Sequence, residues 1–357
     1  MMFKNRLGRS AAILLACSSM LACSSEDDGG TAGLIDGGDD VADANSTSAD
    51  ADTRSGEDFT VTWGPYDVES GIEDTKCMIR RVDNDRAIHV GKIHNVLGNV
   101  SHHFIVYRIA EGEESTEPFN CQPFADVLNP TAGAPLMVTQ KAEETLTLPD
   151  GVAFSFEPNQ LVRLELHFLN ATPETQSLSV TSTFTTVSDA DFEYEADFLF
   201  IGNPDINLAP GETSTLGPYF LPLPADIAGT NIFGITGHTH QLGTDVTVAY
   251  QDGPGGAETM LYDVDNFDWE EPDTVLLDPP QVIGADSGFK FSCSWNNTTA
   301  NQVTFGEGVD EEMCFFWAYY YPSQGARVCV HSEQAPQVAT DLCCPGDALC
   351  ALLDGLL

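Results

Sequence analysis

Basic residues are scarce in this chain of 357 residues, which has 14 lysines and arginines against 55 aspartates and glutamates and a formal net charge of -41. The few basic residues form no patch that could attract phosphates. We therefore expect no nucleic-acid partner. The excess of acidic residues favours solubility instead.

Long apolar runs are absent except at the N-terminus, where three basic residues precede an apolar run over residues 11–22. This is the layout of a secretory signal peptide, which we place at residues 1–22. Residues 20–23, Met-Leu-Ala-Cys, resemble a bacterial lipobox, and residues 14–17 are a weaker candidate. We expect lipidation of Cys23 and a place in the bacterial cell envelope outside the cytoplasm, on the outer membrane, with plain secretion as the alternative. The lipid would be the only membrane contact.

Several familiar catalytic motifs are also missing: no Gly-x-Ser-x-Gly turn, no P-loop and no His-Glu-x-x-His pair occurs. Because no Cys-x-x-Cys occurs, a thiolate zinc site is the minor interpretation of the cysteines. An even number of cysteines in an exported chain is more typical of disulfides. Beyond Cys23, the cysteines are Cys77, Cys121, Cys293, Cys314, Cys329, Cys343, Cys344 and Cys350.

Residues 23–58 are rich in Asp, Gly, Ser, Ala and Thr and hold almost no large apolar side chain, so we expect a disordered acidic tether. The remaining stretch, about 300 residues, suits one large or two ordinary domains. An acidic break near residue 190 divides it into predicted domains at 59–190 and 191–357. The second domain ends in a cysteine-rich tail, for which we expect one short helix over residues 341–357.

Helical periodicity is nearly absent, whereas short runs rich in Val, Ile, Thr, Phe and Tyr recur between clusters of Gly, Pro, Asn and Asp. This pattern predicts an all-β sandwich or barrel. The runs are residues 60–63, 104–109, 161–169, 178–187, 198–201, 232–240, 245–250, 289–295 and 313–321.

Strand periodicity shows which histidines are available, because residues two apart face the same side of a strand. In the run 161–168, His167 shares a polar face with Arg163 and Glu165, opposite an apolar face. A buried core histidine is the alternative, but a polar face beside a carboxylate argues against it.

His238 and His240 are also two residues apart, so both rings can reach one ion. An isolated His-x-His more often holds exposed or hydrogen-bonded imidazoles, and a lone Met beside aromatic residues usually packs in a core. Met313 shares its face with Phe315 and Trp317, which makes a thioether available to the same site. Two imidazoles and a thioether suit copper rather than zinc.

His102 and His103 form a weak pair by geometry, because neighbours on an ideal strand face opposite sides. Shared binding of an ion requires a local kink or different ring nitrogens, and Asn99 and Ser101 make such an irregularity reasonable. We interpret the remaining histidines as surface or structural residues; they are His89, His94 and His331.

Four segments around these candidates carry a resemblance: residues 101–104, 164–170, 237–243, and 311–314 with 320–322. On them the chain resembles the copper type II, ascorbate-dependent monooxygenases, which include dopamine β-monooxygenase and peptidylglycine α-hydroxylating monooxygenase. Each segment alone is a weak signal, but four in the family's order with the right donor types are specific.

The resemblance implies two tandem jelly-roll-like β-sandwich domains with one copper ion each. The first set, for the electron-transfer copper, would be His102, His103 and His167. The second set, for the oxygen-binding copper and catalysis, would be His238, His240 and Met313. The resemblance also implies disulfides between Cys77 and Cys121 and between Cys293 and Cys314, and leaves three connectivities open for the last four cysteines.

The implied reaction is hydroxylation of a substrate C–H bond with O2 and ascorbate or another one-electron reductant. Thr236 and Trp317 replace the Arg and Tyr with which the peptide-amidating branch grips a carboxylate, so a peptide C-terminus is an unsuitable substrate. We expect Thr236, Phe315 and Trp317 to line a pocket for a small apolar or aromatic molecule. The alternatives are a non-catalytic extracytoplasmic copper-binding protein and an adhesion sandwich with incidental histidines.

Overall fold

The computed structural model describes residues 55–121, 133–306, 308, 310–334, 341–345 and 350. The predicted signal peptide, Cys23 and most of the predicted tether lie outside these residues. No helix in the described part of the chain is long and apolar enough to cross a membrane.

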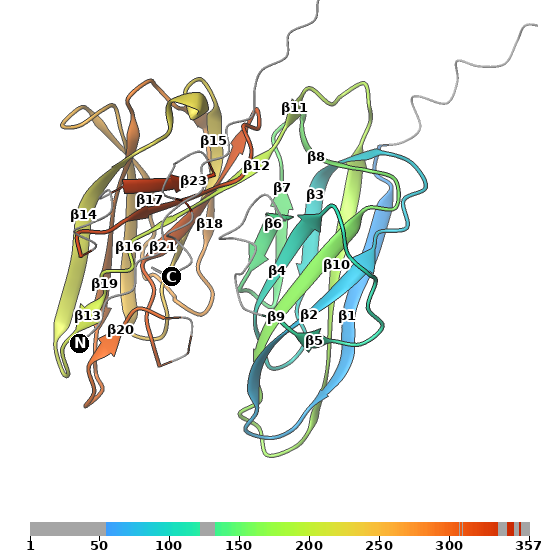
Figure 1. Cartoon of the computed structure of the whole chain (residues 1–357), viewed down its shortest axis with the longest axis horizontal. Coiled ribbons are helices and arrows are strands. Elements are labelled where there is room, and N and C mark those ends of the chain that lie inside the picture. Colours follow the sequence, from blue (N-terminus) through green and yellow to red (C-terminus); the bar gives the residue numbers. More distant parts are fainter. Residues whose placement is uncertain are drawn as a thin grey trace, which may run out of the picture. The chain divides into compact units, whose positions relative to one another are not determined.

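Nearly all of the regular secondary structure in the described residues is strand, and η1 (Ala225–Ile227) is a short 3-10 helix between strands (Figure 1). This confirms the prediction of an all-β fold with jelly-roll-like sandwiches. The strands up to β11 form what we call the first sandwich, and those from β12 onward form the second sandwich. The chain passes from one to the other between Glu195 and Asp197, shortly after the acidic break near residue 190.

The first sandwich has two sheets. The outer sheet has the order β1-β10-β3-β8-β11, with β7 also on β3; its strands are β1 (Asp58–Val68), β10 (Gln176–Val187), β3 (Ile88–Val96), β8 (Val152–Phe156), β11 (Tyr194–Glu195) and β7 (Glu143–Thr147). The inner sheet has the order β5-β2-β9-β4-β6; its strands are β5 (Phe119–Asn120), β2 (Glu73–Arg81), β9 (Leu161–Leu169), β4 (Ser101–Ile109) and β6 (Gly133–Thr139).

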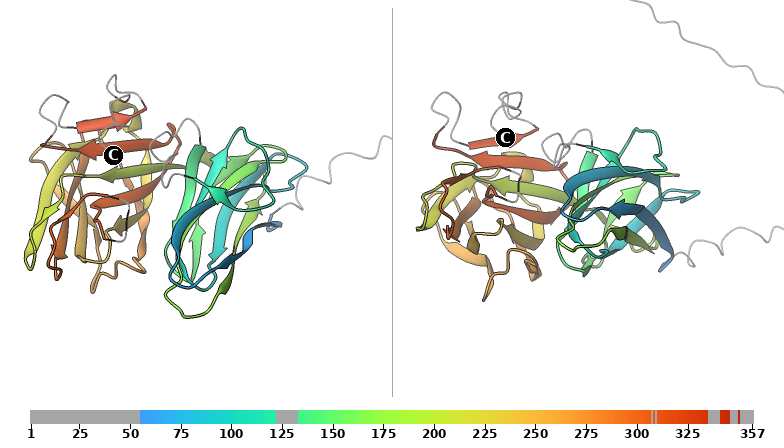
Figure 2. Two further views of the ribbon diagram at one scale, coloured as in Figure 1. Left: turned by 60° about the horizontal axis from the view of Figure 1, so that its bottom comes forward. Right: turned by 90° about the horizontal axis from the view of Figure 1, so that it is seen from below.

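The second sandwich also has two main sheets, shown from two further directions in Figure 2. The central sheet has the order β18-β15-β21-β12-β22-β23; its strands are β18 (Thr274–Val282), β15 (Asn231–His238), β21 (Phe315–Tyr321), β12 (Asp197–Gly202), β22 (Arg327–His331) and β23 (Asp341–Cys344). The distal sheet has the order β14-β19-β16-β17, with β14 (Thr213–Pro222), β19 (Gly288–Asn296), β16 (Gly243–Gln251) and β17 (Glu258–Asp263), and β13 (Asn207–Leu208) pairs with β20 (Val303–Thr304).

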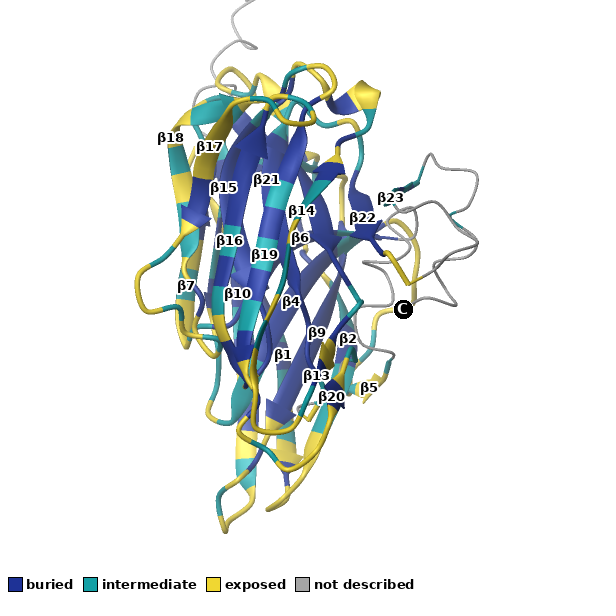
Figure 3. Ribbon diagram, turned by 90° about the vertical axis from the view of Figure 1, so that its left-hand side faces the viewer, coloured by how far each residue is buried: buried dark blue, intermediate teal, exposed yellow. Residues whose placement is uncertain are grey.

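The middle strands of the central sheet are buried on both faces, whereas its edge strand β18 is partly exposed. Along β21 all residues but the last are buried, whereas β10 alternates as a strand with one solvent face does. One face of β21, with Phe316 and Ala318, packs into the core of the second sandwich. The other face, with Phe315 and Trp317, joins a core that includes the first sandwich. Figure 3 shows β15 and β21 buried and β17 and β18 partly exposed.

The cysteine-rich tail differs from its prediction. The expected helix over residues 341–357 is wrong at its start, because Asp341–Cys344 is strand β23, paired with β22. A disulfide between Cys329 and Cys343 joins these two strands. The backbone N–H and C=O groups of β23 form their hydrogen bonds with β22, so they do not need the internal hydrogen bonds of a helix. Most of the remaining tail lies outside the described residues.

The disulfides leave no described cysteine unpaired. Cys77–Cys121 and Cys293–Cys314 are the two pairs that the family resemblance implies. The structure resolves the open question of the last four cysteines as Cys329–Cys343 and Cys344–Cys350. Sequence spacing alone could not choose among the three connectivities.

Candidate metal centres

The three histidines of the first set lie together on the inner sheet. His102 and His103 are on β4 and His167 is on β9, and one ligand atom from each lies within 4.8 Å of the others. The register between β4 and β9 shifts between Ser101 and His103. This irregularity lets two neighbouring residues turn to the same side of the sheet, which an ideal strand forbids.

The hydrogen bonds of this set show which ring nitrogens face inward. The Nδ1 atoms of His102 and His103 lie 3.3 Å apart. His167 donates from Nε2 to the carboxylate of Glu73 at 3.0 Å, so its Nδ1 is left to accept a metal. Sequence reasoning missed Glu73, which begins β2 and comes beside His167 only through sheet pairing.

The face that carries His167 is buried, unlike the solvated polar face that the sequence suggests. Arg163 and Glu165 remain there because they form an ion pair at 3.3 Å and the guanidinium of Arg163 lies 4.0 Å from the ring centre of Tyr107. His167 therefore lies among paired polar groups rather than in an apolar core, and it can still bind an ion.

Burial makes the histidines of the first set poor bases. Loss of solvation, with a contribution from the charge of His240, lowers the pKa of His167 to about 4. Burial and the charges of His167 and His240 lower the pKa of His102 to about 4. Both rings are therefore neutral near pH 7, the form that binds metals.

Acidification is expected to destabilise the metal-free protein. An unfolded histidine has a pKa near 6.5, whereas the pKa values of His102 and His167 in the folded protein are about 4. Between these values the unfolded chain binds protons that the folded protein does not, so the free energy of unfolding falls as the pH decreases. Each shift contributes about 3 kcal/mol.

This prediction can be checked by denaturant unfolding of the metal-free protein at several pH values between about 7 and about 4. A His102→Asn variant should lose stability less steeply, because its side chain does not titrate. An identical pH slope for wild type and variant would contradict the prediction.

In the second set, His238 ends β15 and His240 follows two residues later, with ring centres 5.3 Å apart. The Nδ1 atom of His238 lies 3.1 Å from Oε1 of Gln140, and Nδ1 of His240 donates to the carbonyl oxygen of Glu311 at 3.0 Å. Both rings therefore keep Nε2 for a metal. Nε2 of His238 is buried and has no hydrogen-bond partner in the described part of the chain, which is the condition expected of a metal ligand.

A buried carboxylate joins the Met313 segment to the two histidines. Glu312 accepts hydrogen bonds from the backbone N–H groups of His240 and Leu242, at 2.8 and 2.7 Å, and from Nε1 of Trp295 at 2.9 Å. Burial nevertheless raises the pKa of Glu312. The next residue, Met313, is 3% exposed. Glu312 thus holds the chain that carries the thioether beside the chain that carries His240.

The three residues predicted to line a substrate pocket share one face. Thr236 pairs with Trp317 and His238 pairs with Phe315 across β15 and β21, and the rings of His238 and Trp317 lie 6.1 Å apart. Thr236, Phe315 and Trp317 are each at most 2% exposed. Their role toward a substrate stays a prediction.

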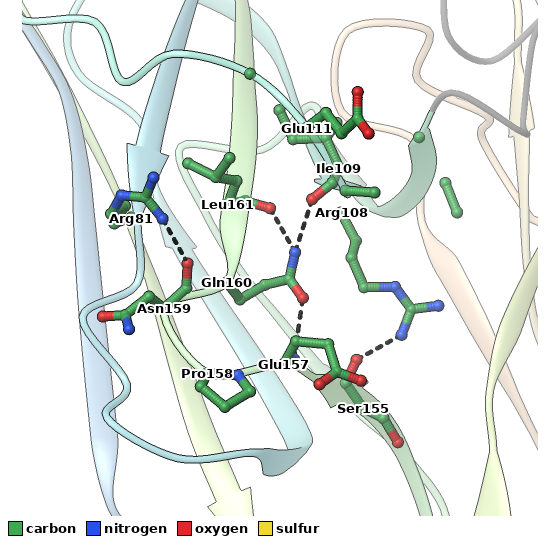
Figure 4. A pocket seen from close by; sticks show the side chains of 14 residues that line it. Arg81, Arg108, Ile109, Glu111, Ser155, Glu157, Pro158, Asn159, Gln160 and Leu161 are labelled. Atoms are coloured by element: carbon green, nitrogen blue, oxygen red, sulfur yellow. Dashed lines mark hydrogen bonds between the residues drawn. The ribbon is translucent and has the colours of Figure 1, made fainter.

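The other three histidines are engaged with residues outside both sets: His89 stacks on Phe192, His94 pairs with Glu143 and His331 pairs with Asp341. A cavity of about 810 Å³ also lies away from both sets, because all its lining residues belong to the first sandwich and none is a candidate ligand (Figure 4). Its Arg108 is occupied by Glu195 and its Arg81 by the carbonyl oxygen of Asn159.

Residues 221–341 match the family model of the copper type II ascorbate-dependent monooxygenase, C-terminal domain. The matched stretch contains all three residues of the second set. Most of the second sandwich is therefore similar to the C-terminal domain of the copper type II ascorbate-dependent monooxygenases.

No curated protein matches the chain. Similar solved structures include the major capsid protein of bacteriophage PM2, with 10% identity and a TM-score of 0.34 over 75% of this chain and 100% of that one. Another is PNGase F, a glycosylasparaginase from Flavobacterium meningosepticum, with 11% identity and a TM-score of 0.37 over 81% of this chain and 100% of that one. Likenesses this low carry no conclusion about this protein.

Proposed function

We propose that the protein is a two-copper monooxygenase that hydroxylates a C–H bond of a small apolar or aromatic substrate, using O2 and ascorbate or another one-electron reductant. The match of residues 221–341 to this family model supports copper and ascorbate dependence. The observation that carries the proposal is that both donor sets have ring nitrogens left for a metal by the hydrogen bonds of the opposite nitrogen.

The donors fit copper. The first set offers three neutral imidazoles. The second offers two imidazoles and, on the segment that Glu312 ties to His240, the thioether of Met313. A thioether favours Cu(I), while imidazole accepts both oxidation states of copper. Copper bound at these sets would supply one-electron redox chemistry and activation of O2. The residues of the chain supply the rest: Glu73, Glu311 and Glu312 orient the ligands, and the buried face of β21 excludes water from them.

The N-terminal sequence supports a proposal for the cellular setting. We propose that the protein is anchored through a lipid on Cys23 in the extracytoplasmic part of a bacterial envelope, or is secreted. Its partners would be O2 and a small molecule, with no nucleic acid. The supporting features are the lipobox-like residues 20–23 and the strongly acidic composition.

One observation favours a non-catalytic copper-binding protein as the second candidate. Thr236, Phe315 and Trp317, which would receive the substrate, are buried against other side chains. A protein that only stores or senses copper would not need access to this face.

Copper titration and oxygen consumption test the two functions. We expect the mature protein to bind two equivalents of copper and, with ascorbate and an accepted aromatic or aliphatic compound, to consume O2 faster than free copper does. A Met313→Ile variant should keep copper at the first set and lose this oxygen consumption. If Met313→Ile changes nothing except copper affinity, and no compound stimulates the wild type, the non-catalytic function is correct.

A further inference from the structure

The loop before β18 brings the second sandwich against the first metal set. The ring of Trp269 lies 5.7 Å from that of His102, with the planes tilted by 33°. Further along, Asp273 forms an ion pair with Lys141 of the first sandwich. The two sandwiches therefore meet beside their candidate metal ligands rather than at a remote surface.

Gln140 makes the reverse connection, from the first sandwich to the second set. It follows Thr139, the last residue of β6, and is 6% exposed. Its Oε1 lies 3.1 Å from Nδ1 of His238, and its Nε2 donates to the backbone carbonyl of Trp269 at 3.4 Å. One side chain of the first sandwich is thus held between two segments of the second.

This arrangement selects one tautomer of His238. The carbonyl oxygen of Trp269 can only accept a hydrogen bond, so it requires the N–H2 group of the Gln140 amide to point toward it. The amide oxygen then points at His238, whose Nδ1 must carry the proton and donate. The lone pair is left on Nε2, the buried atom without a hydrogen-bond partner in the described residues.

We propose that Gln140 is a positioning residue for the second set: the first sandwich fixes the tautomer and ring orientation of a metal ligand that belongs to the second. The proposal rests on the proposed function, because it takes the second set to be a copper site. It follows that the second set reaches its full affinity for copper only when the two sandwiches are docked. His240 differs from His238 in this respect, because the carbonyl of Glu311 in its own sandwich orients its ring.

The tautomer can be tested on the full mature chain without metal. Long-range proton–nitrogen NMR of histidine-labelled protein should show His238 with its proton on Nδ1 in the wild type. A Gln140→Leu variant, which removes the acceptor, should move the proton toward Nε2. Gln140→Glu, which keeps an acceptor at the same reach, should restore the Nδ1–H form. Lys141→Met is the matched control, because it breaks a neighbouring contact between the sandwiches without touching His238.

Copper titration followed by EPR provides the second measurement. In Gln140→Leu one of the two copper equivalents should bind about 10- to 100-fold more weakly, as is usual when the group that orients a ligand is lost. The other equivalent should be unchanged, and Gln140→Glu and Lys141→Met should resemble the wild type. Thermal unfolding of each variant shows whether the fold is intact.

The outcomes separate the possibilities. A wild-type tautomer and wild-type copper affinities in Gln140→Leu would overturn the proposal. Equal losses in Gln140→Leu and Lys141→Met would also overturn it, because the cause would then be general loosening between the sandwiches. If the wild type binds no copper at the second set, the proposed function fails, while the tautomer measurement still supports or overturns the role of Gln140.

Discussion

Replacing His240 with alanine is expected to remove one of two copper equivalents and to abolish ascorbate-dependent oxygen consumption. Its Nε2 is available to a metal because Nδ1 donates to Glu311. Loss of a group that merely orients a ligand usually costs about 10- to 100-fold in affinity or activity, and loss of the ligand itself should cost at least that much. The backbone of residue 240 remains held by Glu312, so the fold should survive.

Copper stoichiometry, EPR and an oxygen electrode measure this effect. His94→Ala is the matched control, because His94 pairs with Glu143 on a partly exposed strand surface and belongs to neither set. It should retain two copper equivalents and full oxygen consumption. Retention of both copper equivalents by His240→Ala would contradict the assignment of this residue to a metal set.

Glu312→Ala is expected to destabilise the fold and weaken the second set together. The substitution leaves three buried donors without their acceptor, namely the N–H groups of His240 and Leu242 and the indole of Trp295. Each unsatisfied buried donor costs about 1–3 kcal/mol, so we expect a loss of about 3 kcal/mol or more in the free energy of unfolding. Copper affinity should fall as well, because Met313 and His240 lose their common anchor.

Denaturant unfolding of the metal-free, disulfide-intact protein measures the stability change. Glu311→Ala is a suitable control. Its carboxylate accepts from the N–H of Gly308 in the described part of the chain, and its backbone carbonyl, which orients His240, is retained. Glu312→Gln should fall between the two, since an amide keeps one acceptor oxygen but turns an N–H2 group toward the donors. A loss in Glu312→Ala no larger than in Glu311→Ala would show that this carboxylate is not an anchor.

Much of the local geometry could be predicted from strand periodicity. Side-chain alternation along residues 232–240 and 313–321 puts Thr236 and His238 on one side of their strand, and Trp317 on the same side as Met313. In the structure β15 pairs with β21 so that Thr236 lies opposite Trp317. The all-β fold followed from the same short-range pattern, because side-chain alternation and turn residues are local properties. The short tail helix was wrong because a cross-strand disulfide and strand pairing prevailed there.

The residues that orient the ligands could not be predicted in the same way. Glu73 and Gln140 lie far in sequence from the histidines they contact and have no spacing that marks them. Glu312 stands beside Met313, but its role depends on an indole and two N–H groups that folding brings to it.

The strand-rich fold, the kinds of donor present and the side of each strand on which they lie can be read from the order of amino acids alone, because they depend on neighbours within a few residues. What covers those sides depends instead on how strands distant in sequence pack together. The polar face around His167 and the aromatic face around Trp317 both became buried, because the two sandwiches share a core. Because of that packing, Gln140 contacts His238 and Trp269 lies beside His102, although neither residue has a sequence pattern that marks it.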